Sequence, residues 1–152
     1  MGYRAYVING SLNFRTQPDV NSPRIASIPN GTALSVTTLQ TPYLWRRTYY
    51  NHRLGYVMAD FLNITSTYDN LVDSCIYFGE SDLQQGSQGN NVVKLQNFLN
   101  LYNFAGLTQD GDFGPATKQA VKNYQSDRGG LTVDGVVGPA TKTRMWNEKE
   151  NG

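Results

Sequence analysis

An eight-residue segment occurs twice in the C-terminal part of the chain. Residues 110–117 read DGDFGPAT and residues 134–141 read DGVVGPAT, so six of the eight positions are identical. An Asp-Gly pair favours a tight turn, in which the Asp side chain bonds to the backbone two residues on. A Gly-Pro pair favours the start of a helix, because proline at the first helical position has no N–H to satisfy. Each copy therefore predicts a turn that leads directly into a helix.

Apolar residues around the first copy follow a helical period. Before it, one stripe at spacings i, i+3, i+7 and i+10 consists of Val92, Leu95, Leu99 and Tyr102. We expect Gly89 or Asn90 to cap the start of this helix and Asn103 to end it in a left-handed conformation. A second stripe consists of Ala116, Ala120, Val121 and Tyr124. With the helix expected after the second copy, residues 83–152 are predicted to form an all-α three-helix bundle.

The N-terminal part of the chain has a different pattern. Over residues 3–62, short apolar segments alternate with Pro and Asn-Gly turn signals every 8–12 residues, which is typical of a small β-barrel or sandwich. Residues 45–50 alternate strictly, as expected for a strand with two distinct faces. Residues 63–82 are polar and turn-rich. We therefore predict two domains, an all-β small barrel at 1–62 and the helical domain at 83–152, with a connector at 63–82.

Composition excludes several classes of protein. The charged fraction is 16% and the formal net charge is +1, which argues against a strongly basic nucleic-acid-binding protein. Apolar runs do not exceed four residues, so the sequence predicts neither membrane insertion nor a signal peptide. One Cys and one His exclude an internal disulfide and a His-rich metal site. Charge is divided unevenly, because residues 1–62 contain six Arg, no Lys and two Asp.

The N-terminal half resembles bacterial Src-homology-3 domains. The motifs that carry the resemblance are Leu12-Asn13-Phe14-Arg15, Pro18, Ile28-Pro29-Asn30-Gly31-Thr32, Trp45, Gly55-Tyr56-Val57 and Phe61-Leu62. The turn at residues 49–53 is longer and more aromatic than this family usually has.

The C-terminal half resembles the three-helix peptidoglycan-binding domain of bacterial and phage cell-wall hydrolases. Besides the two repeat copies, the matching segments are residues 83–89, Val92-Val93-Lys94-Leu95-Gln96, Ala120-Val121 and Tyr124-Gln125. Both resemblances imply non-catalytic binding to the bacterial cell wall by two weak modules, as in the targeting part of an endolysin. They imply peptidoglycan (muropeptide or glycan) as the partner, with teichoic acid as a further anionic candidate. The expected location is extracellular, in the cell wall, or at a lysing cell.

Candidate contact residues combine aromatic rings, which stack on sugars and peptide groups, with polar groups that bond to peptides and carboxylates. In the N-terminal half they are Asn13, Arg15, Trp45, Tyr49, Tyr50 and Tyr56. In the C-terminal half they are Tyr102, Asp112, Phe113 and Gln125, although core positions for Tyr102, Phe113 and Gln125 stay open. We expect neither a metal site nor general acid–base catalysis at Asp110 and Asp112, because the second repeat copy does not retain Asp112. We also expect no other catalytic residue and no cofactor.

The sequence leaves three other functions open. The aromatic and basic residues of segment 45–53 are also typical of single-stranded nucleic-acid binding, which the low net charge disfavours. A protein-interaction adaptor that binds a peptide through the barrel is a second alternative. A weak cell-wall hydrolase is a third.

Overall fold

The computed structural model describes residues 1–38 and 44–151. The chain divides into two compact units, an N-terminal unit of Met1–Ile76 and a C-terminal unit of Tyr77–Gly152. The predicted domain limits at residues 62 and 83 stay a prediction. Residues 63–82 were expected to be a connector, but the structure has a complete helix there and a strand that begins one residue earlier.

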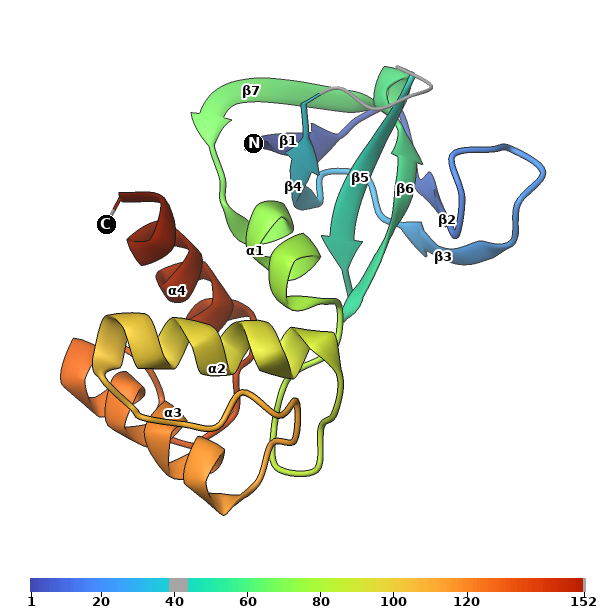
Figure 1. The fold of residues 1–152 in the computed structure, drawn as a ribbon. Helices are drawn as coiled ribbons and strands as arrows, with labels where there is room; N and C mark the ends of the chain where they lie inside the picture. Colours follow the sequence, from blue (N-terminus) through green and yellow to red (C-terminus); the bar gives the residue numbers. More distant parts are fainter. Residues whose placement is uncertain (39–43, 152) are drawn as a thin grey trace. The chain divides into compact units, whose positions relative to one another are not determined.

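The N-terminal unit is built on one antiparallel sheet (Figure 1). Its strands are β1 (Gly2–Val7), β2 (Leu12–Arg15), β3 (Arg24–Ile28), β4 (Ala33–Thr37), β5 (Trp45–Tyr50), β6 (Arg53–Met58) and β7 (Leu62–Tyr68). A short 3₁₀ helix, η1 (Ala59–Phe61), connects the last two strands. The strand order is β3-β2-β6-β5-β4-β1-β7.

The prediction of a small β-barrel is wrong, because this seven-stranded sheet is open. Strands β3 and β7 form its two edges. Strand β7 falls in the segment expected to be a connector, yet it pairs with β1 through Ala5↔Ile64 and Val7↔Leu62. Its side chains are mostly exposed, so they lack the apolar pattern of a buried strand. The added edge strand extends the sheet instead of closing it.

Buried side chains of the strands form a hydrophobic cluster in this unit. Its buried members are Ala5, Val7, Leu12, Phe14, Ile28, Leu34, Val36, Val57 and Leu62. Gly55 is required here, because a Cβ at this position would lie 2.6 Å from the Phe14 ring. Asn51 and His52 both adopt positive φ angles of 51° and 67°, which allows the tight turn between β5 and β6.

Four helices follow, α1 (Leu71–Phe78), α2 (Asn90–Asn103), α3 (Pro115–Arg128) and α4 (Pro139–Asn151). Gly89 caps α2, and Gly114 caps α3 with proline at its first turn, as the sequence predicted. The predicted left-handed residue at Asn103 is wrong by one position, since Phe104 takes that conformation with a φ of 53°. Among the helices in the described part of the chain, none combines the length and apolarity needed to cross a bilayer.

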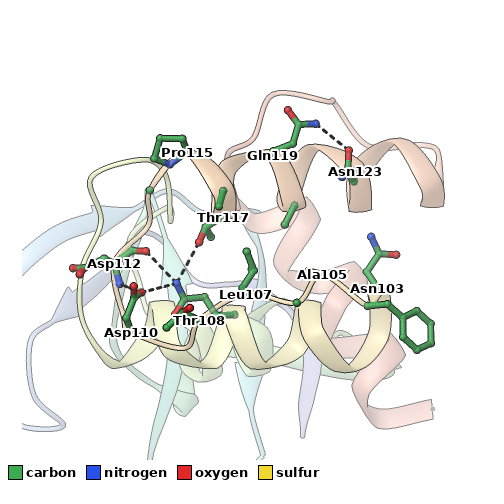
Figure 2. A pocket seen from close by; sticks show the side chains of 16 residues that line it. Asn103, Ala105, Leu107, Thr108, Asp110, Asp112, Pro115, Thr117, Gln119 and Asn123 are labelled. Atoms are coloured by element: carbon green, nitrogen blue, oxygen red, sulfur yellow. Dashed lines mark hydrogen bonds between the residues drawn. The ribbon is translucent and has the colours of Figure 1, made fainter.

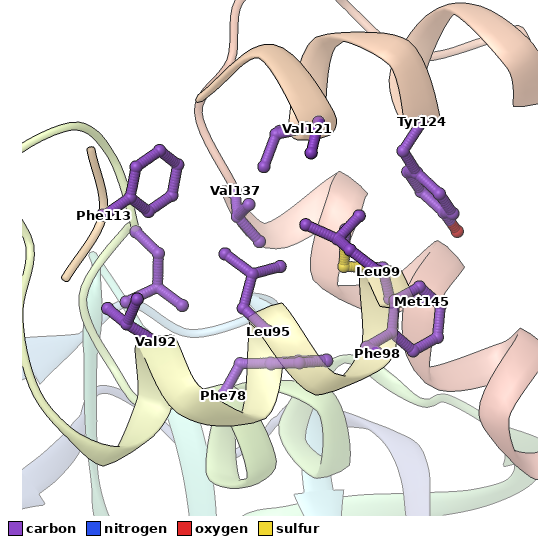
Figure 3. Packing of buried hydrophobic residues seen from close by; sticks show 12 residues of the cluster. Phe78, Val92, Leu95, Phe98, Leu99, Phe113, Val121, Tyr124, Val137 and Met145 are labelled. Atoms are coloured by element: carbon purple, nitrogen blue, oxygen red, sulfur yellow. The ribbon is translucent and has the colours of Figure 1, made fainter. Parts of the chain in front are cut away.

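The prediction of a three-helix bundle is also wrong. The C-terminal core includes Phe78 from α1 and three residues from loops, which are Leu83, Phe113 and Val137 (Figure 3). The loops are tied together by backbone bridges, one of which joins Leu83 to Val137. Core residues from α2, α3 and α4 complete the cluster. Loops and helix α1 therefore supply packing that the three following helices alone would supply in a bundle.

Candidate functional site

A buried glutamine organises the first copy of the repeat. The side-chain amide nitrogen of Gln96 lies 3.1 Å from Asp110 Oδ1, 3.0 Å from the Asp112 carbonyl and 3.2 Å from Thr117 Oγ1. Its amide oxygen accepts a hydrogen bond of 3.0 Å from the Gly111 N–H. Gln96 is 1% exposed, so these bonds satisfy a buried amide that would otherwise be costly. They fix the turn to helix α2 and to the first turn of α3.

A second glutamine makes the same contacts in the second copy. The amide nitrogen of Gln125 lies 3.1 Å from Asp134 Oδ1, 3.0 Å from the Val136 carbonyl and 3.3 Å from Thr141 Oγ1. Its oxygen accepts a bond from the Gly135 N–H at 3.0 Å. The duplicated segments therefore share a three-dimensional arrangement as well as a sequence.

Both Asp-Gly pairs form the predicted Asx turns. Asp110 Oδ1 accepts from the Asp112 N–H at 2.9 Å, and Asp134 Oδ1 accepts from the Val136 N–H at the same distance. The bond from the Asp112 backbone, followed by that from the Gln96 amide, lowers the pKa of Asp110 below its ordinary value. Asp110 is therefore a carboxylate at neutral pH.

A cleft of about 670 Å³ lies next to the first copy (Figure 2). The end of α2, the following loop and the start of α3 form its walls. We call it the acidic cleft, and its lining residues are Gln96, Asn103, Phe104, Ala105, Gly106, Leu107, Thr108, Asp110, Asp112, Gly114, Pro115, Ala116, Thr117, Gln119, Ala120 and Asn123.

The two ends of the acidic cleft differ in chemistry. Figure 2 shows Asp110 and Asp112 at one end, and Asn103 and Asn123 at the other. Leu107 lies between them and is held by two bonds to the Asn100 side chain, of 2.7 and 2.9 Å. Among the described residues that line the cleft, the two aspartates are the only charged ones.

Phe104 adds an exposed aromatic ring to this lining. Its side chain is 91% exposed, although it is large and apolar. It also occupies the left-handed conformation that ends α2, which non-glycine residues adopt at a cost. The conformation positions an aromatic face where a ligand can reach it.

The second copy has a smaller cavity of about 190 Å³. Gln96 and Asp110 are 14 positions apart in the sequence, whereas Gln125 and Asp134 are 9 apart. The shorter connection leaves less chain to build a wall. The first copy therefore offers the larger binding volume.

Residues 88–145 match the family described as "Putative peptidoglycan binding domain". The chain belongs to this family through these residues. All residues that line the acidic cleft lie within the matched segment. The match does not extend over residues 1–87, so the resemblance of residues 3–62 to bacterial Src-homology-3 domains stays a prediction.

Several solved structures are similar to the chain, among them the following two. The N-terminal domain of SleB is 35% identical, with a TM-score of 0.43, over 45% of this chain and 92% of that one. A peptidoglycan-binding protein from Clostridioides difficile, in complex with glutamine hydroxamate, is 17% identical, with a TM-score of 0.41, over 95% of this chain and 92% of that one. A search of curated proteins gave no match.

Of the four contact residues predicted in the peptidoglycan-binding domain, Asp112 alone lines the acidic cleft. Phe113 is 2% exposed and belongs to the core. Tyr102 is half-buried and stacks on Phe98 with ring centroids 4.6 Å apart. Gln125 is buried, and its amide is engaged in the second turn. The structure thus gives these three side chains packing contacts and does not bring them to the cleft.

Sequence reasoning missed most of the cleft. The sequence pattern predicted Asn103 only as the end of a helix, and it gave no signal for Phe104, Leu107 or Asn123, all of which line the cleft. The loop between the α2 stripe and the first repeat copy was the available clue, because loops on a rigid scaffold often carry binding residues.

The N-terminal unit has a cleft of its own, of about 220 Å³. We call it the arginine cleft, and it is lined by Ser11, Leu12, Asn13, Arg15, Val20, Trp45, Met58 and Phe61. It brings together three of the predicted contact residues, Asn13, Arg15 and Trp45. Arg15 donates one hydrogen bond of 2.8 Å to the Ser22 carbonyl. Of the described residues around this cleft, Arg15 is the only charged one.

The other predicted residues of this unit divide between the two faces of the sheet. Arg15 and Tyr56 are cross-strand partners, as are Tyr56 and Arg47, so the three share a face. The Arg47 guanidinium lies 5.7 Å from the centroid of the Tyr56 ring. Tyr49 is on the same face but is only 8% exposed. Tyr50 is on the opposite face, where its ring meets that of Phe14 edge-on at 5.9 Å.

Proposed function

We propose that this chain binds bacterial peptidoglycan without cleaving it and that the acidic cleft is its main binding site. The observation that carries the proposal is that a cleft of about 670 Å³ lies entirely within the segment that matches the peptidoglycan-binding family. Binding sites are typically concave and combine apolar walls with a few placed polar groups. The acidic cleft has this composition.

The carboxylates of the cleft suit binding better than acid catalysis. A general acid works best when its pKa is near the operating pH. The hydrogen bonds from the Asp112 backbone and the Gln96 amide move the pKa of Asp110 in the opposite direction. Asp110 is therefore poorly placed to donate a proton to a leaving group at neutral pH.

In this proposal the arginine cleft is a second site that contacts the bacterial cell wall. Trp45 is 6% exposed, so it supplies a wall of the cleft more than an open stacking surface. Arg15 and Asn13 lie beside it and can bond to carboxylates of stem peptides or to phosphates of teichoic acid. Two weak sites on one chain increase retention on a repeating polymer by roughly 10² to 10⁴ when both can engage it.

Such a chain would act as the targeting region of a cell-wall hydrolase or endolysin. It would hold the enzyme at the wall, either outside the cell or after release at lysis. A short flexible ligand in an open cleft is expected to bind with about millimolar affinity, near −4 kcal/mol. Weak individual sites allow release and rebinding along the polymer.

Cosedimentation with purified sacculi tests the proposal. Phe104→Ala should reduce retention about tenfold, because it removes an exposed ring from the cleft. Leu101→Ala is the matched control, since Leu101 is also exposed, at 63%, but does not line the cleft. Failure of the unchanged protein to sediment with sacculi, or an equal effect of both variants, would contradict the proposal.

A further inference from the structure

We propose that the acidic cleft recognises an ammonium group of the wall, namely the free side-chain amine of a diamino acid in an uncrosslinked stem peptide. This inference rests on the proposed function and specifies its ligand. It comes from a cavity of about 670 Å³ whose described lining includes two carboxylates and neither lysine nor arginine.

The lysines and arginine of the two helices that form the cleft are not among its lining residues. On α2, the Lys94 ammonium lies 3.2 Å from the Tyr77 carbonyl. On α3, the Lys118 and Lys122 side chains lie beside Gly135 of the second repeat copy. Arg128 pairs with Glu148 at 2.8 Å. None of these cations lines the acidic cleft, so no lysine or arginine among its described lining residues neutralises the two aspartates.

The start of helix α3 does not reverse this charge. Its N-terminus lines the same cleft and carries a partial positive charge of about one half of an elementary charge. Two carboxylates outweigh it, so the local balance is negative. An anionic ligand would therefore be repelled, whereas an ammonium group would be attracted.

The backbone holds Asp112 in place while its side chain stays exposed. Its N–H donates to Asp110 Oδ1 at 2.9 Å, and its carbonyl accepts from the Gln96 amide at 3.0 Å. The side chain of Asp112 is exposed and extends the lining of the cleft. A carboxylate on a fixed backbone loses little freedom when it binds an ammonium group, which favours binding.

The rest of the cleft fits a peptide attached to that amine. The carboxylates lie at one end, whereas Asn103 and Asn123 lie at the other (Figure 2). Side-chain amides can bond to both the N–H and C=O groups of a peptide. Crosslinking converts the amine into a neutral amide, so the cleft would distinguish uncrosslinked stems from crosslinked ones.

Sacculi with chemically acetylated amines provide the test, compared with mock-treated sacculi. We expect acetylation to weaken retention of the unchanged protein about tenfold, since a charge-assisted hydrogen bond is lost. Asp112→Asn should show the same loss on mock-treated sacculi and little further loss on acetylated ones. Glu150→Gln removes one exposed carboxylate outside the cleft and should behave as the unchanged protein does.

The outcomes separate the two proposals. Equal retention on acetylated and mock-treated sacculi, or full retention of Asp112→Asn on mock-treated sacculi, would overturn the amine inference while peptidoglycan binding stands. Absence of retention on both preparations would overturn the proposed function itself. Circular dichroism of each variant must match that of the unchanged protein, and Asp112→Glu, which keeps the charge, should retain most of the binding.

Discussion

The two clefts of this chain differ most in the sign of their charge. The charged residues among the described lining are two aspartates in the acidic cleft and one arginine in the arginine cleft. The formal charge of the whole chain is only +1, which conceals this difference. Whole-chain charge therefore says little about a binding site, whereas the side chains around each cleft specify which ligand groups it can accept.

The difference matches the chemistry of the proposed ligand. Stem peptides carry ammonium groups on diamino acids and carboxylates at their ends, so one stem presents both signs of charge. The acidic cleft is proposed to take the first group and the arginine cleft the second. The comparison can be tested by disabling one cleft at a time.

The largest expected effect is destabilisation of the N-terminal unit, and with it the arginine cleft, by a substitution in its hydrophobic core. Phe14 is fully buried between Asn13 and Arg15 on β2, and Phe14→Ala should cost about 3 to 5 kcal/mol of folding free energy. Urea unfolding would measure the cost, and two-dimensional NMR would show whether changes are confined to the N-terminal unit. A loss under 1 kcal/mol would contradict the packing described here.

A smaller loss of folding free energy is expected when the buried Gln96 amide beside the acidic cleft is removed. Gln96→Leu should cost about 2 to 4 kcal/mol, because the buried Gly111 N–H loses its acceptor and the turn loses its amide donor. Thermal unfolding measures this cost. Gln125→Leu should have a similar cost in stability, but the molecules that stay folded should still bind sacculi. If the folded fractions of both variants lost binding equally, the proposal that only the first repeat copy supports the main binding site would be contradicted.

Charge changes at the clefts should affect binding more than folding. Arg15→Ala should weaken binding to a carboxylate-bearing ligand about tenfold, or about 1.4 kcal/mol, and leave binding of an amine-bearing ligand unchanged. Asp112→Asn should show the reverse preference. Isothermal titration with stem peptides blocked at one group or the other makes the comparison, and identical preferences in both variants would contradict it.

The smallest effect concerns acid stability. The pKa of Asp110 is lowered in the folded state, so its stabilising contribution is present above the ordinary pKa, about 4, and is lost as pH falls through the lower folded value. Asp110→Asn should therefore reduce the melting temperature at pH 7 and have less effect at pH 2. An equal reduction at both values would contradict a role for the ionised carboxylate.

Local sequence signals correctly predicted the turns and helix starts of the repeat. Asx turns, the Gly89 and Gly114 caps and the Pro115 helix start depend on neighbouring residues, and the structure confirms them. The roles of Gln96 and Gln125 were not predicted, because their partners lie 9 to 21 positions away. The open sheet was missed for a related reason, since β7 is polar and its place depends on pairing with β1.

Aromatic residues show why site prediction was harder than prediction of the fold elements. Phe113 and Phe104 are the same residue type, but one is 2% exposed and the other 91% exposed. The sequence pattern favoured Phe113 because it belongs to a motif. Exposure depends on where the chain turns after α2, which the motif does not encode.

The most direct test is an NMR titration of the full chain with a soluble uncrosslinked muropeptide and with the same muropeptide acetylated on its amine. We expect chemical-shift changes at the Gly106, Leu107, Asp112 and Gly114 amides that are strong with the free amine and weak after acetylation. Shifts confined to residues outside the acidic cleft, or equal shifts with both ligands, would contradict it.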